Sequence, residues 1–193
     1  SGIATGALLA APMVWGQAKP RVVVIGGGAG GATAARYIAK DSDGAIDVTL
    51  VEANPIYTTC FFSNLYLGGF RDFESLQHGY DKLSGGGVTV INDMATGVDR
   101  DARTVTLAGG QVLPWDRLVL SPGIDFKDGS VPGWSLDAAE VMPHAYKAGP
   151  QTQLLRQKVD AMPQGGTFAM VAPPNPYRCP PGPYERISMV AHV

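Results

Sequence analysis

Short runs of apolar, β-branched residues alternate along this sequence with segments whose apolar positions suit helices. Residues 21–25 form the first apolar run, and the small residues 32–35 that follow it are compatible with a closely packed helix. A second apolar run, over residues 47–51, leads into Glu52. Apolar strands joined by a helix are typical of a parallel β-α-β unit. The pattern therefore predicts a strand–helix–strand unit over residues 21–52.

Beyond residue 52 the pattern predicts more short elements, separated by glycine, proline and aspartate turns. They are a helix (73–83), strands (88–92, 96–99, 104–107 and 111–113), a strand ending at Ser121, a helix (151–162), a strand (167–172) and a helix from about Pro183. The three strands between 96 and 113 have the spacing of a meander. Residues 124–150 are predicted to be irregular. The elements as a whole indicate an α/β protein rich in loops.

The first turn of the chain's β-α-β unit carries the pattern Gly26-x-Gly28-x-x-Gly31. In a dinucleotide-binding turn the first glycine permits the sharp bend, the second lets a pyrophosphate approach, and the third packs the helix on the strand. Glu52 lies about 20 residues farther on, where a carboxylate accepts ribose hydroxyls. A glycine-rich turn in an ordinary α/β unit is the alternative. The complete strand–glycine–helix–strand–Glu arrangement favours dinucleotide binding.

Charge and composition exclude several other classes of protein. The 193 residues carry 17 acidic and 15 basic side chains without a long run of one sign, which argues against nucleic-acid binding. Residues 1–18 are largely apolar and end in a small-x-small pattern, which indicates the remnant of a secretory signal; a floppy N-terminal arm is the alternative. This run is too short to span a bilayer. A genuine signal would place the protein in the periplasm.

The two cysteines, Cys60 and Cys179, are far apart and form no CxxC or CxxCH motif. That spacing argues against a zinc site, and against haem attached to this chain. The segment containing Cys60 follows Glu52 and is expected to cross the carboxyl ends of the strands, where ligands of such folds bind. Cys60 would then lie near a bound dinucleotide. The alternative is a small, buried apolar residue among aromatic neighbours.

A second dinucleotide domain is expected to begin with the strand at 167–172. Prolines follow this strand where a nicotinamide-binding domain has glycines, and proline has no N–H group to donate to a pyrophosphate. The nicotinamide site is therefore predicted to be lost. Cys179 instead stands beside Arg178 and before a helix, two features that stabilise a thiolate. A Cys60–Cys179 disulfide joining two domains is the alternative for an exported protein.

Five segments, at residues 22–38, 57–64, 78–83, 143–149 and 178–186, resemble the flavoprotein subunit of flavocytochrome c sulfide dehydrogenase. The segment RCPPGPYER at 178–186 is far more specific than the glycine pattern. The resemblance implies a Rossmann-like FAD-binding domain of the two-dinucleotide-domain, glutathione-reductase-like flavoproteins, with a β-meander and the start of a second, similar domain. The closing Ser121-Pro122-Gly123 turn, usually Ala-Thr-Gly in such flavoproteins, also favours FAD.

The resemblance further implies a role for each site residue. Gly26, Gly28, Gly31 and Glu52 would hold the ADP half of FAD, Ala95 would lie beside the adenine, and Ser121, Pro122 and Gly123 would line the cofactor. Cys60 would bind FAD covalently through its sulfur. Cys179 would be the redox thiol, paired with a later cysteine that this sequence lacks. Sulfide would be the substrate, and a c-type cytochrome subunit, in a heterodimer, would take the electrons.

The resemblance also implies boundaries: a signal remnant at 1–18, an FAD-binding domain at 19–150, and a truncated second dinucleotide-type domain at 151–193. The sequence is thus expected to be a fragment of a longer protein. A sulfide:quinone oxidoreductase and a non-catalytic FAD-binding module are the alternative functions, and an NADH-linked disulfide reductase is a weaker one. No transmembrane segment and no metal site are expected.

Overall fold

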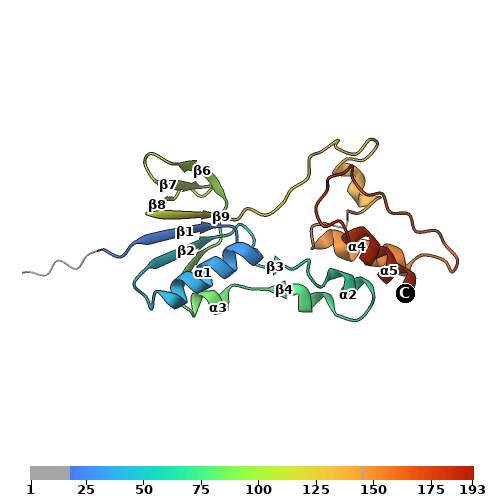
Figure 1. Cartoon of the computed structure of the whole chain (residues 1–193), viewed down its shortest axis with the longest axis horizontal. Helices are drawn as coiled ribbons and strands as arrows, with labels where there is room; N and C mark the ends of the chain where they lie inside the picture. Colours follow the sequence, from blue (N-terminus) through green and yellow to red (C-terminus); the bar gives the residue numbers. More distant parts are fainter. Residues whose placement is uncertain (1–17, 145) are drawn as a thin grey trace, which may run out of the picture.

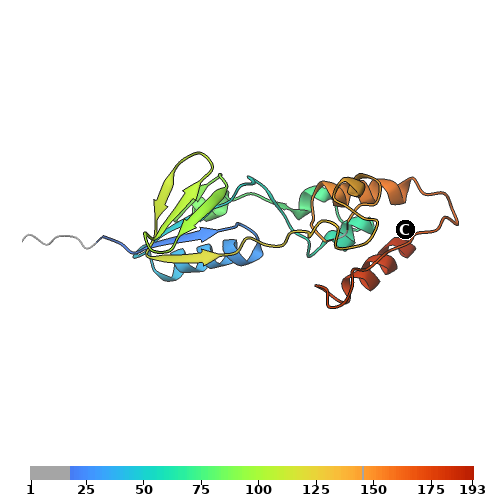
Figure 2. The ribbon, with the colours of Figure 1, turned by 90° about the horizontal axis from the view of Figure 1, so that it is seen from above.

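The computed structural model describes residues 18–144 and 146–193. These residues form an elongated molecule with a β-rich lobe and a helical lobe (Figure 1). The lobes are joined by a ribbon of two short strands, β3 (Tyr57–Thr58) and β4 (Gln77–His78), and by the extended segment after residue 120, as Figures 1 and 2 show. The predicted strand–helix–strand unit belongs to the β-rich lobe.

Four parallel strands form the main sheet in the order β5–β2–β1–β9. Their bounds are Val88–Ile91 (β5), Asp47–Val51 (β2), Arg21–Ile25 (β1) and Arg117–Leu120 (β9). The sheet thus joins strands that lie far apart in the sequence. The predicted parallel α/β fold is confirmed.

Both faces of this sheet are covered, which explains its near-continuous apolar strands. On one face, Val22 and Val24 pack with Ala35 of helix α1 (Ala29–Asp41). On the other face, Val23 packs against Val105 of the meander. The meander strands are β6 (Ala95–Asp99), β7 (Thr104–Leu107) and β8 (Val112–Pro114), close to the predicted positions. Alternate side chains of one strand therefore supply two separate cores.

An ion pair fixes the amino ends of β1 and β9. The backbone N–H of Arg21 donates to Asp116 at 2.7 Å, and its guanidinium donates twice more to the same carboxylate, each at 3.1 Å. The hydrogen bonds from Arg21 lower the pKa of Asp116 to about 2. Asp116 therefore stays ionised at neutral pH and keeps the β9 edge in register with β1.

The helix predicted over residues 73–83 is wrong. The chain instead forms a 3₁₀ turn η1 (Phe73–Leu76), strand β4, and a short helix α3 (Asp81–Ser84). Phe73, Leu76 and Tyr80 are all buried, so these apolar positions do face the interior of the protein even though they do not share one helix. The intervening Gln77 and His78 pair instead with β3, because the backbone of the connecting ribbon needs hydrogen-bonding partners.

The helical lobe is built from three helices, α2 (Ser63–Leu67), α4 (Pro150–Asp160) and α5 (Gly182–His192), with a 3₁₀ turn η2 (Asp137–Glu140) beside α4. The core of the lobe consists of Leu67, Leu155, Val159 and Val190. Helix α2 comes from the predicted first domain and packs on helices from beyond residue 150. The domain boundary at 150 remains a prediction.

The strand predicted over residues 167–172 is also wrong, since this segment forms no strand in the structure. Only its Phe168 packs against the core of the helical lobe. A strand is stable when a neighbouring strand pairs with its backbone groups. Within the described ranges 18–144 and 146–193, no strand lies beside this segment. The helices predicted at 151–162 and from about Pro183 are confirmed as α4 and α5.

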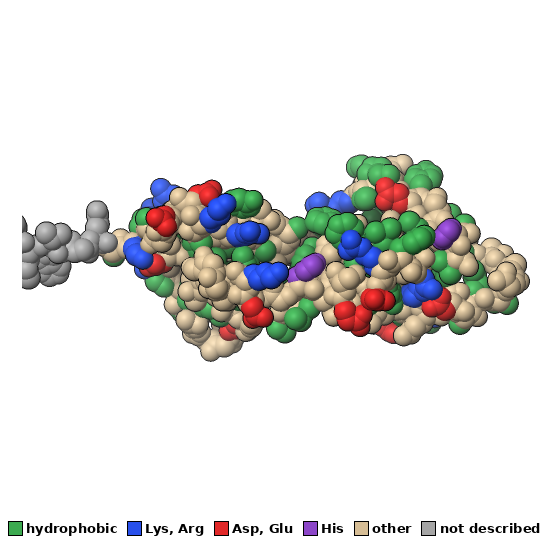
Figure 3. Space-filling view, turned by 90° about the horizontal axis from the view of Figure 1, so that it is seen from below, with side chains coloured by type: hydrophobic (Ala, Val, Ile, Leu, Met, Phe, Trp, Pro, Cys, Tyr) green, Lys and Arg blue, Asp and Glu red, His purple; other side chains and the backbone are tan. Residues whose placement is uncertain are grey.

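The two lobes differ in surface character. On the face shown in Figure 3, lysine and arginine side chains are spread over the β-rich lobe, whereas hydrophobic side chains gather over the helical lobe. Phe61, Val171 and Tyr184 are among the exposed apolar side chains, at 69%, 80% and 73% exposure. In the part of the chain that the structure describes, no helix is both long and apolar enough to cross a membrane.

Candidate functional site

The glycine turn lies between the carboxyl end of β1 and the start of α1. Gly26 has a φ of +97°, and a methyl group built on it would overlap the carbonyl oxygen of Ser121. A methyl group on Gly31 would overlap the carbonyl oxygen of Gly26. These two glycines are therefore required by the packing of the chain on itself.

Gly28 is different, because its surroundings are open. It is the N-cap of α1 at a φ of −69°, and no side chain caps the helix. A methyl group on Gly28 would meet only the ring of Tyr57, at 3.6 Å. The first turn of α1 also contains no acidic residue. This combination leaves a positive helix end accessible to a phosphate group, so the turn fits the pyrophosphate of a dinucleotide.

Glu52 lies directly against the glycine turn. Its Oε2 accepts the backbone N–H of Gly27 at 2.6 Å, and its Oε1 accepts the backbone N–H of Asn54 at 2.9 Å. The carboxylate is only partly buried. Its remaining lone pairs can accept hydroxyl groups, so its position fits the ribose contact that the sequence predicted. One donor to Glu52 thus comes from the glycine turn, and the other comes from the segment that follows Glu52 itself.

Tyr80 belongs to the same site, although sequence reasoning did not single it out. Its hydroxyl donates to the carbonyl oxygen of Gly27 at 3.0 Å, and its side chain is buried. Burial, with smaller contributions from Glu52 and Tyr57, raises the pKa of Tyr80 to about 12. Tyr80 is therefore a neutral donor at physiological pH. Its signals in the sequence were the apolar spacing that it shares with Leu76 and Phe73 and its place in the resembling segment at 78–83.

Changing Tyr80 to phenylalanine should loosen the glycine turn without emptying the core. Loss of the bond to Gly27 is expected to lower the free energy of unfolding by about 1 kcal/mol. Urea unfolding monitored by circular dichroism gives this value. Tyr37→Phe is a matched control, because Tyr37 is half exposed on α1 and its change should be close to neutral. Equal unfolding midpoints for Tyr80→Phe and the native protein would contradict the role assigned to this hydrogen bond.

The turn after β9 closes the other side of the glycine turn. Ser121 donates its N–H to the carbonyl oxygen of Ile25 at 2.8 Å, and Gly123 has a φ of +80°. Ser121 is thus brought against Gly26, with Pro122 and Gly123 directly after it. Ala95 begins β6 and packs into the core that contains Val51, at the carboxyl end of β2. The predicted cofactor residues from four separate segments therefore converge on one edge of the sheet.

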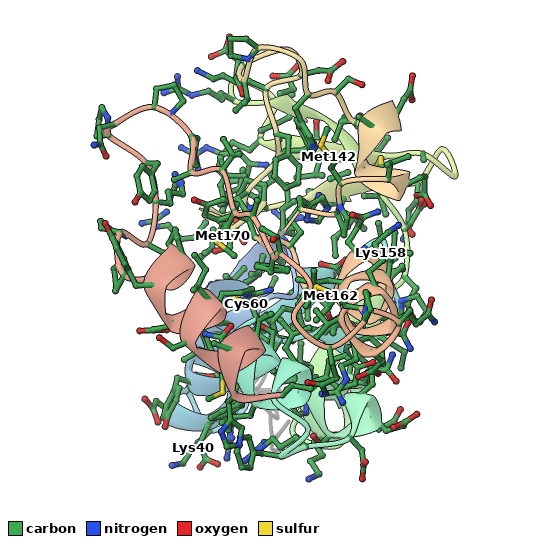
Figure 4. The ribbon with its side chains drawn as sticks, turned by 90° about the vertical axis from the view of Figure 1, so that its right-hand side faces the viewer. Lys40, Cys60, Met142, Lys158, Met162 and Met170 are labelled. Atoms are coloured by element: carbon green, nitrogen blue, oxygen red, sulfur yellow. The ribbon has the colours of Figure 1, made fainter. Side chains whose placement is uncertain are left out.

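Cys60 lies on the ribbon that leaves this edge, just after β3. Its side chain is exposed, so the alternative of a buried apolar cysteine is wrong. Its carbonyl oxygen accepts the hydroxyl of Ser63 at 2.8 Å and the N–H of the same residue at 3.2 Å. In the end view of Figure 4, Cys60 is seen beside α5. Tyr57, which lies on β3 shortly before Cys60, has its ring against Gly28, so this ribbon begins beside the glycine turn.

Cys179 stands immediately before α5 in an unusual backbone conformation. Its φ is +56°, in the left-handed region that side chains other than glycine rarely adopt. Its carbonyl oxygen accepts the N–H of Gly182 at 2.9 Å, and a methyl group on Gly182 would lie 3.1 Å from its sulfur. Both cysteines are free, so the alternative of a Cys60–Cys179 disulfide is wrong. Strain of this kind is concentrated at functional sites.

A second arginine near the start of the last helix is Arg186. Arg178, which the sequence places beside Cys179, is exposed, as Cys179 itself is. Arg186 is only 7% exposed and lies on α5. Burial lowers the pKa of Arg186, whereas negative charge on Cys60, and then on Cys179, raises it. Its guanidinium donates to the hydroxyl of Ser63 at 3.0 Å, so the helical lobe contains a buried cation bonded to the residue that begins α2.

The fold and the glycine turn define a dinucleotide-binding oxidoreductase. The family model for pyridine nucleotide-disulphide oxidoreductases matches residues 20–160, more than half of the chain. The family model for the central part of the sulfide dehydrogenase [flavocytochrome c] flavoprotein chain matches residues 152–193. A flavoprotein chain of that name from Chlorobaculum thiosulfatiphilum is 57% identical over 44 residues, which are 23% of this chain and 90% of that sequence. The chain belongs to the flavocytochrome c sulfide dehydrogenase flavoproteins, within the pyridine nucleotide-disulphide oxidoreductase family.

Sulfide-oxidising relatives of a second kind are also similar. A sulfide-quinone reductase from Aquifex aeolicus is 35% identical over 104 residues, which are 53% of this chain and 24% of that protein. The crystal structure of the sulfide:quinone oxidoreductase from the same organism superposes with a TM-score of 0.58 at 28% identity. That match covers 75% of this chain and 33% of the solved chain. The chain thus spans a minor part of these two relatives.

Membership in a flavoprotein family implies FAD as the cofactor, and the observed residues fit it. The opening at Gly28, the uncapped start of α1 and the carboxylate of Glu52 match a pyrophosphate and an adjacent ribose. No group of three metal-ligating side chains occurs within residues 18–144 and 146–193.

Proposed function

We propose that this protein is the flavin-binding part of a sulfide dehydrogenase that oxidises sulfide to sulfur or polysulfide. The observation that carries the proposal is the pair of exposed, free cysteines, one on the ribbon that leaves the nucleotide-binding turn and the other just before α5. Neither thiol is used in packing, so their exposure favours reactivity over structure. The family to which the chain belongs contains sulfide dehydrogenase flavoproteins.

Gly28 and Glu52 are proposed to hold the ADP half of FAD, with Gly26 and Gly31 shaping the turn. Ser121, Pro122, Gly123 and Ala95 are proposed to line the remaining cofactor surface. Cys60 is proposed to bind FAD covalently through its sulfur. The exposure of Cys60 supports this role, as does its place on the ribbon that carries Tyr57 to the glycine turn. When bound, FAD supplies a two-electron acceptor that can release electrons one at a time.

Cys179 is proposed to form a redox-active disulfide with a second cysteine outside this sequence. Hydrosulfide would attack one sulfur of that disulfide, form a persulfide with it, and release the other sulfur as a thiolate. The place of Cys179 supports this assignment, because its free thiol is exposed and lies just before α5. The thiolate carries the electron pair that leaves sulfide.

The electron acceptor is proposed to be a c-type cytochrome subunit in a heterodimer, in a periplasmic location. The name of the family's flavoprotein chain supports the cytochrome. The predicted signal remnant, which supports export, lies almost wholly outside the described residues. The alternative acceptor is a quinone, favoured by the similarity to the sulfide-quinone reductase of Aquifex aeolicus.

Anaerobic addition of sulfide to the flavin-loaded protein tests this proposal. We expect sulfide to bleach the flavin absorbance, and a soluble c-type cytochrome to restore it faster than a short-chain quinone does. Cys179→Ser should lose bleaching by sulfide but keep bleaching by dithionite, which shows that its flavin remains bound. Bleaching by NADH but not by sulfide would overturn the proposal in favour of a disulfide reductase. Faster reoxidation by quinone would replace the cytochrome with the alternative acceptor.

A further inference from the structure

Two side chains hold the backbone of one residue in the glycine turn, Gly27. The hydroxyl of Tyr80 donates to the carbonyl oxygen of Gly27 at 3.0 Å, and the N–H of Gly27 donates to Glu52 at 2.6 Å. Neither contact is local, because these partners lie 53 and 25 residues away from Gly27 in the sequence. The peptide groups before and after Gly27 are therefore both fixed by the tertiary structure.

The hydrogen bond from Tyr80 also fixes the direction of the next N–H group. The carbonyl oxygen of Gly27 and the N–H of Gly28 belong to one planar, trans peptide unit, in which the C=O and N–H bonds point in opposite directions. Tyr80 is buried in the core that contains Val24 and Ala35. Since the carbonyl oxygen of Gly27 points to the hydroxyl of Tyr80, the N–H of Gly28 points away from it.

This N–H group is available to a ligand. The N–H of Gly27 is taken up by Glu52, whereas the N–H of Gly28 finds no acceptor among the residues that the structure describes. Gly28 is the N-cap of α1, and the first N–H groups of an α-helix have no partner within the helix. A methyl group on Gly28 would meet only the ring of Tyr57. Tyr80 thus directs a free donor at the open start of α1.

We propose that Tyr80 is a positioning residue for the cofactor, which holds the carbonyl oxygen of Gly27 and thereby presents the N–H of Gly28 to a phosphate of the nucleotide. The inference rests on the proposed function, in which this turn binds the ADP half of FAD. A donor whose direction is fixed before binding loses less conformational freedom on binding. Without the hydroxyl of Tyr80, the peptide unit between Gly27 and Gly28 is freer to rotate, and the phosphate has to reorient it.

The same contact requires a glycine at position 27, which lies outside the Gly26-x-Gly28-x-x-Gly31 pattern. A methyl group on Gly27 would lie 2.5 Å from the hydroxyl oxygen of Tyr80 and 2.7 Å from the ring carbon that carries it. Both distances are shorter than side chains tolerate, so alanine at this position has to displace the ring. Gly27→Ala therefore breaks the hydrogen bond from the opposite partner.

Calorimetric titration of the flavin-free chain with ADP and with adenosine tests this role. Both ligands offer ribose hydroxyls to Glu52, but only ADP carries phosphates. We expect Tyr80→Phe to lower the affinity for ADP by about fivefold, the factor that one hydrogen bond of ordinary strength supplies, and the affinity for adenosine by less than about twofold. Gly27→Ala should show the same selective loss. Tyr37→Phe, half exposed on α1, is the control and should change neither affinity.

A second measurement uses the native protein, so it does not depend on whether a variant folds. Nuclear magnetic resonance of protein labelled at its glycine nitrogens reports on the Gly28 amide, whose signal is identified by its loss in Gly28→Ala. ADP should shift this signal by more than adenosine does, because only the phosphates reach the N–H.

Equal losses of affinity for ADP and adenosine in Tyr80→Phe would show that the hydroxyl supports only the fold, and would overturn the inference. An unchanged affinity for ADP in this variant would overturn it too, as would a Gly28 signal that does not respond to ADP. A native protein that binds neither ligand would overturn the proposed cofactor site itself. That failure is observed before any variant is compared, so the two failures are distinguishable.

Discussion

Cys60→Ser should lose all of the yellow colour that stays with the native polypeptide after acid denaturation. Serine has no sulfur with which to form the thioether, and its hydroxyl is too weak a nucleophile at neutral pH to form an ether instead. Cys60 is exposed and free, so its replacement by a residue of similar size should leave the fold intact. Acid precipitation followed by the visible spectrum of the pellet measures the effect. Mass spectrometry of the Cys60 peptide should show a flavin-sized adduct in the native protein only.

Cys179→Ser is the matched control, since it removes the other exposed thiol. This variant should keep the acid-stable colour while losing reduction of the flavin by sulfide. Colour that persists in Cys60→Ser would exclude Cys60 as the attachment residue. A native Cys60 peptide of unmodified mass would exclude covalent attachment altogether, and would leave a dissociable flavin in the same nucleotide-binding turn.

Gly31→Ala should lower the stability of the fold, whereas Gly28→Ala should mainly weaken cofactor binding. A methyl group at Gly31 overlaps the backbone oxygen of Gly26, so α1 must move away from β1. We expect a loss of at least about 3 kcal/mol of unfolding free energy. That loss corresponds to a fall in Tm of roughly 6 to 12 °C for a chain of this size.

At Gly28 the backbone is already in a conformation that alanine adopts, and the nearest atom is at ordinary contact distance. Gly28→Ala should therefore change the unfolding free energy by less than about 1 kcal/mol. Its methyl group would occupy the space proposed for the pyrophosphate, so FAD affinity should fall by at least about tenfold.

Thermal melts of the flavin-free proteins and titrations with FAD separate the two effects. Gly30→Ala is the stability control, because a methyl group there meets only the hydroxyl of Ser121, at 3.7 Å, and alanine favours a helix. Unchanged FAD affinity in Gly28→Ala would show that the phosphate approaches elsewhere. An unchanged Tm in Gly31→Ala would show that the close contact between α1 and the glycine turn does not limit stability.

The elements that sequence predicted well are those whose interactions are local. Strand β1, the glycine turn and α1 follow one another without a break, so each restricts the next. The same holds for β2 and Glu52, whose acceptance of the Gly27 N–H follows once the two strands are parallel neighbours. The periodicity of the apolar residues and the glycines of the turn are together sufficient to specify such a unit.

The predictions that failed depend on partners far away in the sequence. Residues 73–83 have a helical apolar spacing, yet Gln77 pairs with Thr58 across the connecting ribbon. The segment at 167–172 has the composition of a strand but no neighbouring strand among the described residues. Secondary structure in both places is decided by where the backbone finds hydrogen bonds.

The sequence by itself determined the nucleotide-binding unit, the two reactive-cysteine candidates and the replacement of a second glycine turn by prolines. Only the tertiary structure decided that both thiols are exposed, that Tyr80 donates to the carbonyl oxygen of Gly27, and that Arg186 is buried. The partner of Arg186 is Ser63, which lies far from it in the sequence, so sequence spacing alone does not reveal this contact. The sequence shows the periodicity of each helix or strand, whereas the environment of a charged side chain depends on which elements pack around it.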